Sequence, residues 1–390
     1  MHNHTKLKIS LMLLRPNAVN QIGGDLIQIQ SIAENLNLIP NFEVTVDIWS
    51  IDWNPLNIDL VLIFNEKPLL LLDILMKTKG HDIKVAFAPI HHSDSEVIRI
   101  FSNKHKIINL LSKVKFETNK LHTNSVLVHL LYLLSDIISI KRIYGIKIAL
   151  TKFWQCRVIF LGRKKFWAYF NNLTFISFLS KIEKDNFERD YGYQAKNVIF
   201  VPNGIPQEFE KSVTPWDDRK KDIVVVGRVE NRKGQLAIVK HLGFRNLRID
   251  FLGPMNPNNQ DYFIEFINIV ESIENFCYLG EIPHEKMASK LQNYKVLLLN
   301  SHAEVLSLVE LEAASMGLYV VTTTSGGSKE YINKSQLFEY EFGDLDTASE
   351  ICEKIIRENA APLSTTKVMT WMEVSRIYAN NFERVLNKVI

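Results

Sequence analysis

The sequence contains little cysteine. Its 390 residues include only Cys156, Cys277 and Cys352, an odd number without paired spacing. This usage argues against a disulfide framework and a zinc site, and it predicts a reducing, cytoplasmic environment. The sequence also has little excess of charge of either sign, because 46 Lys and Arg and 43 Asp and Glu leave a formal net charge of +3. Such a balance gives no argument for nucleic-acid binding by itself.

Long hydrophobic runs are missing as well. The longest extends from Val126 to Ile140 and contains His129 and Asp136, so it is shorter than the roughly 20 apolar residues that span a bilayer. The apolar run near the start stops at Arg15 and Pro16 without a small-residue cleavage site, which favours a buried strand over a signal peptide. We therefore expect no transmembrane helix and no export.

The sequence does have short Val/Ile/Leu-rich runs that alternate with longer helical patterns. Continuous apolar strands alternating with helices indicate parallel sheets covered by helices on both faces. The predicted strands occupy residues 7–14, 43–49, 60–64, 84–90, 197–205, 222–228, 248–254, 295–301 and 318–324. The fold class is therefore α/β.

A segment rich in proline and charge, "VPNGIPQEFEKSVTPWDDRKKD", lies between the two series of strands and reads as a linker. A chain of this length and 46% hydrophobic content also exceeds what one core usually organises. We predict two doubly wound domains, residues 1–208 and 209–371. In such sheets ligands bind beyond the carboxyl ends of the strands, and the cleft between two domains is the expected site.

Positive charge is concentrated in residues 99–170, where fourteen Lys and Arg accompany only two acids, Glu117 and Asp136. Aromatic residues gather at its end: Phe153, Trp154, Phe160, Phe166, Trp167 and Tyr169. A basic, aromatic, amphipathic segment predicts attachment to an anionic membrane surface, with about 1 kcal/mol from each cation. Solvated helix faces over an ordinary core are the alternative. Nucleic acid is a third, without a recognition motif to support it.

The stretch "DIVVVGRVENRKGQ" predicts a buried strand that ends at Gly227, with Arg228 and Lys233 in the next loop and Gly234 at the start of a helix. Two cations at the carboxyl end of a strand beside a helix start can bind a diphosphate. On its own, this spacing fits a solvated basic loop equally well.

The stretch "HAEVLSLVELEAASMG" repeats this arrangement one unit later. Ser307 and Glu310 spell S-x-x-E, which predicts a capping box and a helix from Ser307 to Gly317. The backbone N–H groups of Leu308 and Val309 would then face a second phosphate at the helix start.

Glu304 lies before that helix and Glu312 within it, eight positions apart. Carboxylates are poor partners for phosphate but good acceptors for vicinal hydroxyls. The pair therefore suits a ligand with a sugar at each end of a diphosphate.

Taken together, these motifs resemble the retaining nucleotide-sugar glycosyltransferases of family four, whose GT-B fold has two Rossmann-like domains facing a central cleft. The resemblance rests on "VGRVENRKG", the E-x7-E pair, Gly317, "SGGSKE", "VPNGI", "GGD" after the first strand and the terminal "TWMEVSRIYANNFERVL". It implies that a helix at 372–390 packs back onto the first domain.

The resemblance also implies roles for individual residues. Arg228 and Lys233 would bind the diphosphate, Glu304 the donor sugar and Glu312 the ribose. Further implied donor contacts are Gly24, which lets the first domain approach the phosphates, and Ile282 in "YLGEI", which lines the base pocket.

A histidine near the transferred sugar is implied as well, and "FAPIHHSD" offers His91, which we favour, or His92.

The D-x-D sequence at Asp344 to Asp346 precedes a helical pattern, so an aspartate N-cap is the better interpretation than a metal motif. We expect no cofactor and no required metal, because Arg228, Lys233 and a helix start would balance the leaving diphosphate. The family's front-face retaining course is implied, with the departing phosphate helping to deprotonate the acceptor.

The predicted donor is a UDP- or GDP-linked sugar. Ser307, Val305 and Leu306 depart from the family pattern and leave the sugar identity open. The predicted acceptor is a glycan or lipid-linked glycan in surface polysaccharide biosynthesis, such as that of lipopolysaccharide, at the inner face of the cell membrane, with no nucleic acid involved. The alternatives are a nucleotide-sugar epimerase of the same fold and a non-catalytic scaffold that binds nucleic acid or membrane.

Overall fold

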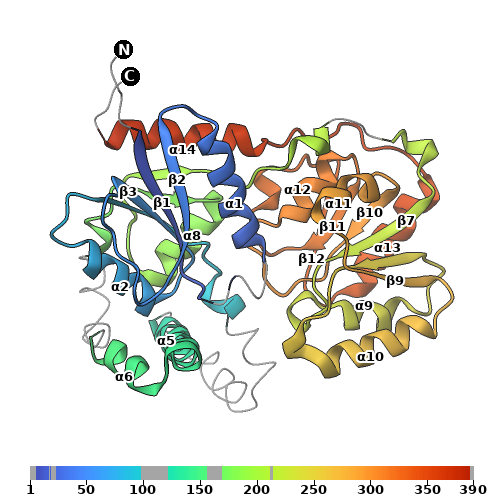
Figure 1. Ribbon diagram of the computed structural model, residues 1–390. Helices are drawn as coiled ribbons and strands as arrows, with labels where there is room; N and C mark the ends of the chain where they lie inside the picture. Colours follow the sequence, from blue (N-terminus) through green and yellow to red (C-terminus); the bar gives the residue numbers. More distant parts are fainter. Residues whose placement is uncertain are drawn as a thin grey trace. The chain divides into compact units, whose positions relative to one another are not determined.

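The computed structural model describes residues 6–16, 18, 23–97, 122–155, 169–210 and 214–386. The chain divides into two units, the first made of Met1–Asn203 with Trp371–Ile390 and the second of Gly204–Thr370 (Figure 1). The division after Asn203 lies slightly before the predicted boundary between 208 and 209. In the second unit, Ile205 pairs in parallel with Thr370 and its N–H donates to the Met369 carbonyl at 2.9 Å. This pairing explains why the residues after Asn203 belong to the second unit.

The first unit is built on a six-stranded parallel sheet in the order β2-β1-β3-β4-β5-β6. Its strands are β1 (Leu7–Leu13), β2 (Phe42–Ile48), β3 (Leu60–Phe64), β4 (Lys84–Ala88), β5 (Ile176–Phe178) and β6 (Val198–Phe200). All were predicted except β5. That strand is buried, but Ser177 interrupts its apolar run, whereas β6 is apolar throughout.

Helices of the first unit are α1 (Gly24–Asn37), α2 (Pro68–Thr78), α5 (His122–Tyr144), α6 (Ile146–Gln155), α8 (Lys181–Tyr191) and α14 (Trp371–Val385). The helix expected at 372–390 is α14, which lies beside α1 (Figure 1). Ser375 Oγ donates to the Ile32 carbonyl at 3.3 Å, and the Phe382 ring contacts Phe42 and Phe175. These contacts attach the end of the chain to the first sheet.

The core on the other side of this sheet joins α2, α5, α6 and α8. Leu69–Leu72 of α2 pack there with Leu133 and Ile140 of α5, Ala149 of α6 and Phe187 of α8. No helix within the described ranges is long and apolar enough to cross a membrane. Residues 98–121 and 156–168, which hold much of the predicted basic segment, lie outside the described residues.

The second unit is built on another six-stranded parallel sheet, in the order β12-β11-β10-β7-β8-β9. Its strands are β7 (Lys221–Val226), β8 (Ile249–Leu252), β9 (Phe276–Gly280), β10 (Tyr294–Leu298), β11 (Tyr319–Thr323) and β12 (Leu337–Tyr340). The sequence predicted the four central strands and missed β9 and β12. Both missed strands are at sheet edges and are largely half-buried, so neither is a continuous apolar run.

Around the second sheet lie the α-helices α9 (Gln235–Leu242), α10 (Gln260–Glu271), α11 (His284–Leu291), α12 (Leu308–Ser315) and α13 (Leu345–Glu358). Short 3-10 turns that bear on the site are η3 (Gln207–Glu210), η5 (Asn231–Lys233) and η7 (Ser328–Glu330). Because all strands run in parallel, the loops after β7, β10 and β11 emerge at one edge of the sheet. The predicted donor-binding residues of this unit lie mostly in these loops.

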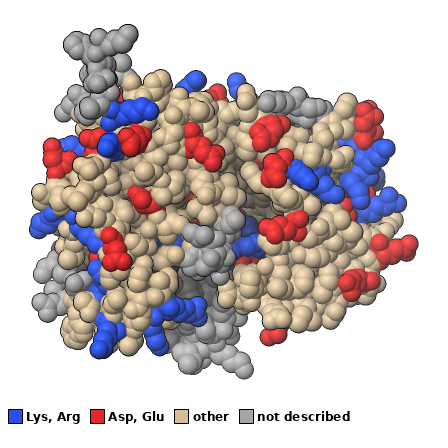
Figure 2. Space-filling view, in the orientation of Figure 1, with Lys and Arg blue, Asp and Glu red and all other residues tan. Residues whose placement is uncertain are grey.

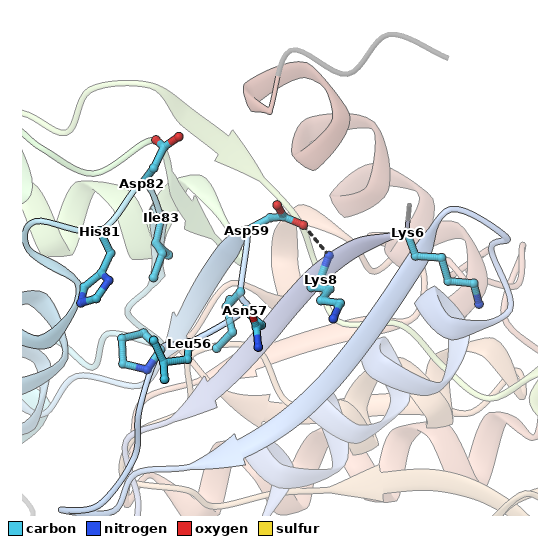
Figure 3. A pocket seen from close by; sticks show the side chains of 10 residues that line it. Lys6, Lys8, Leu56, Asn57, Asp59, His81, Asp82 and Ile83 are labelled. Carbon is cyan, nitrogen blue, oxygen red and sulfur yellow. Dashed lines mark hydrogen bonds between the residues drawn. The ribbon is translucent and has the colours of Figure 1, made fainter. Parts of the chain in front are cut away.

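A cavity of ≈ 380 Å³ opens on the first unit and has Lys8, Asp59, His81 and Ile83 among its lining residues (Figure 3). A second, of ≈ 480 Å³, opens on the second unit beside Lys221, Arg248, Asp250 and Tyr294. Both lie at the amino ends of parallel strands. Ligands of doubly wound sheets bind at the opposite edge, so neither cavity is the candidate site.

Candidate donor-binding site

The loop after β7 is shaped by two glycines. Gly227 has φ +146°, and a Cβ at this position would meet the Lys233 chain at 3.4 Å. That distance is an ordinary van der Waals contact, so the positive φ explains the glycine, and the Lys233 chain packs against it at the end of β7. Gln235, buried at the start of α9, donates from Nε2 to the Arg228 carbonyl at 2.8 Å and holds the loop from behind.

This loop is fastened to the loop after β10. Gly234 has φ +66°, and an added Cβ would collide with the Asn300 carbonyl. His302 N–H donates to the Arg232 carbonyl at 2.8 Å, and Arg232 Nη1 donates to the Ala303 carbonyl at 3.0 Å. Two loops that are far apart in sequence thus form one surface.

Two cations form ion pairs with Glu304 on this surface. Lys233 Nζ lies 2.6 Å from Glu304 Oε1, and Arg232 Nη1 lies 3.4 Å from the same oxygen. Burial would raise the pKa of Glu304, but the charges of Lys233 and Arg232 outweigh it and lower the pKa to about 2. Lys233 and Glu304, which the sequence analysis assigned to neighbouring parts of one donor, are therefore in contact, with Glu304 ionised. Arg232 was missed, although it stands in the same "NRK" run.

Arg228 lies in the same loop but pairs with another carboxylate. Its Nη2 is 3.7 Å from Glu230 Oε2, and Arg232 Nε is 3.3 Å from Glu230 Oε1. Burial favours the neutral form of Glu230, yet these cations lower its pKa. Three cations (Arg228, Arg232 and Lys233) against Glu230 and Glu304 leave the loop surface with one net positive charge.

The start of α12 differs from the prediction. Ser307 is the N-cap in extended conformation, but its side chain makes no capping hydrogen bond. Glu310 does not reach back to the cap. It is fully buried and accepts hydrogen bonds from Thr322 Oγ1 at 2.7 Å and from Ser328 Oγ. The capping-box prediction is wrong, because the third helical position faces the end of β11 and not the helix start.

Burial raises the pKa of Glu310 to about 7, more than its two hydroxyl donors lower it. These donors tie α12 to β11 and to η7, which follows the "SGG" turn at 325–327. In that turn Gly326 has φ +93°, and its Cβ would lie 2.8 Å from the Glu304 carbonyl. Gly327 N–H donates to the Val305 carbonyl at 2.7 Å. The turn therefore supports the backbone that carries Glu304.

Leu308 and Val309 are the first two residues of α12, and both are half-buried. The N–H groups at the start of a helix have no intrahelical acceptor. The helix begins where the loop that carries Glu304 ends. The N–H groups of Leu308 and Val309 therefore remain the predicted hydrogen-bond donors for an anion.

Glu312 lies on the next turn of α12, and its side chain is 4% exposed. Its Oε1 lies 2.9 Å from His284 Nε2 at the start of α11. The hydrogen bond and charge of Glu312 raise the pKa of His284, more than burial lowers it. Ile282, from the predicted base-pocket segment, is two residues before His284. The structure thus joins Glu312 to this segment through His284, a residue that the sequence analysis missed.

In the first unit, His91 does not fit the predicted role. Its side chain has no exposed surface, and its ring lies between Glu66 Oε2 at 2.5 Å from Nδ1 and Asp190 Oδ2 at 3.0 Å from Nε2. Burial lowers the pKa of His91, but the two carboxylates outweigh it and raise the pKa to about 10. A sealed histidine with both ring nitrogens engaged cannot contact a sugar in this conformation. The alternative, His92, is half-buried.

Two further predicted positions have structural explanations. Gly24 is the first residue of α1, next to an ion pair of 2.9 Å between Arg15 and Asp25; residues 19–22 lie outside the described part. Asp344 caps α13 by accepting from Thr347 N–H at 3.2 Å, which confirms the N-cap interpretation of the D-x-D sequence. Across the described residues, no group of three or more His, Cys, Asp or Glu could hold a metal ion.

Comparison with known proteins agrees with this architecture. Residues 206–365 match the family model described as "Glycosyl transferases group 1". The phosphatidylinositol N-acetylglucosaminyltransferase GPI3 subunit of Saccharomyces cerevisiae (strain YJM789) is 29% identical over 212 residues, which cover 47% of this chain and 45% of that protein. The chain therefore spans about half the length of the curated relatives it matches.

Solved structures extend the likeness to both units. A sucrose-phosphate synthase from Thermosynechococcus elongatus has a TM-score of 0.68 at 13% identity, covering 98% of this chain and 100% of that chain. The Anabaena protein HepE in complex with UDP-glucose has a TM-score of 0.64 at 12% identity, covering 97% and 100%. At such identities the likeness shows the fold alone. It is the two-sheet GT-B fold that the sequence predicted.

Proposed function

We propose that the protein, whose residues 206–365 belong to the glycosyl transferases group 1 family and whose fold is GT-B, transfers a sugar from a nucleotide-diphosphate sugar to an acceptor. The observation that carries the proposal is the contact of 2.6 Å between Lys233 and Glu304 at the carboxyl edge of the second sheet. It brings a cation that can bind phosphate next to a carboxylate that can accept hydrogen bonds from hydroxyls. That combination fits the junction of sugar and diphosphate in the donor.

In this function Lys233 and Arg228 bind the diphosphate. An ammonium group has three donors, so Lys233 can keep Glu304 and still donate to phosphate oxygens. The N–H groups of Leu308 and Val309 add donors from the start of α12. Such groups, aimed in advance at the atoms on which charge develops, stabilise the departing diphosphate as its bond to the sugar breaks.

Glu304 and Glu312 bind the two sugars of the donor. Glu304 is ionised at neutral pH, since its pKa is about 2, and it can accept hydrogen bonds from hydroxyls of the transferred sugar. Glu312 is assigned to the ribose, with Ile282 and its neighbours beside the base. HepE was solved with UDP-glucose, which supports a nucleotide sugar as the donor class.

The proposed reaction retains the configuration at the anomeric carbon. The bond from that carbon to the diphosphate oxygen breaks, and the acceptor oxygen forms its new bond on the same face. The acceptor proton passes to the leaving phosphate. We expect no metal requirement, because chain cations and a helix start offset the phosphate charge; unchanged activity after chelation with EDTA is the check.

A lipid-linked glycan, built into a surface polysaccharide or lipid-linked oligosaccharide, is the proposed acceptor. The Saccharomyces cerevisiae relative is named for transfer to phosphatidylinositol, which supports a lipid-bearing acceptor. In this chain α5 and α6 expose apolar side chains: Leu134, Ile138, Ile143, Ile146, Leu150 and Trp154. Lys141, Arg142 and Lys147 are exposed on the same two helices, and Figure 2 shows Lys and Arg gathered on this part of the first unit.

Buried ion pairs hold these two helices against α2. Lys67 Nζ lies 3.3 Å from Asp136 of α5, and Lys152 of α6 pairs with Asp73 of α2. These pairs hold the two helices to the first unit, and the cations and apolar side chains that the helices expose suit peripheral attachment to an anionic membrane.

A donor panel tests the proposal. UDP- and GDP-sugars are screened by thermal stabilisation, since a ligand at 100 times its dissociation constant adds about 2.7 kcal/mol to the free energy of unfolding. The stabilising donor is then incubated with lipid-linked acceptors, and products are identified by mass spectrometry. A glycosylated acceptor supports transfer. An altered sugar still attached to its nucleotide would identify an epimerase instead, and no response to any donor would favour a non-catalytic protein.

A further inference from the structure

His284 and Glu312 form a contact that the proposed function has not used. Glu312 is almost fully buried on α12, and its carboxylate meets His284 Nε2 at 2.9 Å. His284 comes from a different element, the first turn of α11, and its side chain is 38% exposed. It therefore connects a buried carboxylate to the surface of the unit.

The ring of His284 has a defined position. It lies 6.4 Å from the ring of Phe209, a fully buried residue of η3, with an angle of 40° between the planes. Packing on one side and a hydrogen bond at Nε2 restrict rotation of the imidazole. Glu312 Oε1 is then held by a donor of fixed direction, and the carboxylate plane is held with it.

The orientation of the carboxylate plane matters for the ribose-binding role assigned to Glu312. A carboxylate that accepts from both hydroxyls of a vicinal diol needs its plane aligned with the two oxygens of the sugar. A residue that fixes the plane before binding reduces the ordering needed when the ligand arrives. A carboxylate has about four acceptor sites, so the contact of His284 with Oε1 leaves others that can accept hydrogen bonds from hydroxyls.

We infer that His284 is a positioning residue for the nucleoside of the donor: it orients Glu312 so that the carboxylate recognises the vicinal hydroxyls of ribose. The inference rests on the proposed function, because it assumes that Glu312 faces the ribose. It assigns ribose recognition to a pair of residues on two helices, and His284 touches the carboxylate and not the reacting atoms.

Charge around His284 strengthens this role. Acidic groups face it from three elements: Glu312 on α12, Glu208 on η3 and Glu285 on α11 itself. Together they favour the protonated imidazole and raise its pKa. A protonated ring donates a stronger, charge-assisted hydrogen bond to Glu312 than a neutral one. Discrimination for ribose should therefore weaken as pH rises through the pKa of His284.

The test compares ribonucleotides with 2′-deoxyribonucleotides by isothermal titration calorimetry on the full chain. UDP, GDP and their 2′-deoxy forms are titrated into the wild type, His284→Ala and His284→Gln. Hydrogen bonds to charged groups predict that the wild type prefers the ribo form by about tenfold or more. His284→Ala should reduce this ratio to less than about threefold. His284→Gln should restore most of it through its amide donor, without the pH dependence.

Two controls separate positioning from general damage. His241→Ala removes an exposed histidine of α9 that lies 3.0 Å from Asp346, and it should leave the ratio unchanged. In a Glu312→Ala background, His284→Ala should have no further effect on the ratio, because the carboxylate that it orients is gone.

The outcomes separate a failure of the inference from a failure of the proposed function on which it rests. An unchanged ratio in His284→Ala overturns the inference and leaves the proposed function in place. A ratio lowered equally by His241→Ala, or lowered further by His284→Ala without Glu312, also overturns it. A wild type that binds neither UDP nor GDP overturns both.

Discussion

Two clusters of paired charges, one in each unit, differ in their access to solvent. In the first unit the His91 side chain is 0% exposed between Glu66 and Asp190. In the second, Lys233 and Glu304 keep 14% and 12% of their side-chain surface, and neighbouring Arg228 keeps 31%. We therefore assign a structural role to the sealed pairs, and we propose ligand binding for the pairs whose cations reach the surface.

The sealed cluster holds the loop after β4 in place. His91 N–H donates to Glu183 at 2.8 Å, and Asp94 N–H donates to Asp190 at 2.8 Å, so both ends of this turn are bound to α8. The open cluster instead joins the loops after β7 and β10. This comparison yields the following predictions, in order of decreasing effect.

Removing His91 should have the largest effect, and the effect should be on stability. His91→Ala leaves Glu66 and Asp190 buried without their cation, and breaking a buried pair in this way costs about 3–5 kcal/mol. Chemical denaturation measures the loss, and His81→Ala, an exposed histidine of the same unit, is the control. If His91→Ala is as stable as the control, the sealed cluster is not structural.

The same cluster predicts a pH dependence of stability. The pKa of His91 is about 10 in the folded protein, above the ordinary value of 6.5. Its contribution is therefore complete below about pH 6.5 and is lost as pH rises toward 10. Denaturation of the wild type and His91→Ala at pH 6 and pH 9 should show the difference between them shrinking with pH.

Removing Lys233 should reduce catalysis by roughly 10²–10³-fold, because one charged donor to the developing phosphate is lost. Stability should fall as well, because Glu304 loses its nearest cation and keeps only Arg232, so turnover is measured where the variant is still folded. Product formation with saturating donor measures the effect, and Lys240→Ala on α9 is the matched control. Near-normal turnover in Lys233→Ala would remove this residue from the diphosphate site.

Glu310→Ala should cost about 1–3 kcal/mol of stability, because Thr322 and Ser328 lose their buried acceptor. Folding raises the pKa of Glu310 from 4.5 to about 7, so the native state binds its proton more tightly. Its contribution to stability should therefore fall as pH rises from about 4.5 to 7. Glu310→Gln should remove that slope, whereas Glu350→Ala on the exposed face of α13 should keep it.

Membrane attachment should show the smallest effect per residue, about 1 kcal/mol for each cation near the surface. Reversal of Lys141, Arg142 and Lys147 to Glu should weaken co-sedimentation with anionic liposomes, and added salt should weaken that of the wild type. Reversal of Lys220, Lys240 and Lys286 in the second unit is the control. Equal binding by both triple variants would contradict attachment through α5 and α6.

In the second sheet, sequence patterns predicted the strands that are buried over most of their length. These are the four inner strands, and all were found. The edge strands β9 and β12 consist mostly of half-buried residues, so they form no continuous apolar run, and both were missed. In the same way, "S-x-x-E" gives the spacing of a capping box but not the direction of the Glu310 side chain. Glu310 accepts a hydrogen bond from Thr322 at the end of β11, so it does not cap the helix.

The site was predicted where the chemistry lies in the loops that follow strand ends. Arg228, Lys233 and Glu304 follow strand ends, and the register of a parallel sheet brings those ends together. His284 was missed because its partner Glu312 lies 28 residues away and on another helix. Arg232 was missed because nothing in the "NRK" run shows that it, beside Lys233, reaches Glu304. His91 was misassigned for a related reason: the carboxylates that seal it come from Glu66 and Asp190, on other elements.

The central claim is that Lys233 holds the diphosphate of the donor. Calorimetry of UDP against uridine, and of GDP against guanosine, isolates the affinity that the diphosphate adds. We predict that the wild type gains affinity from the diphosphate and that Lys233→Ala loses about tenfold or more of this gain, with nucleoside affinity unchanged. The same gain in Lys233→Ala as in the wild type would contradict the account.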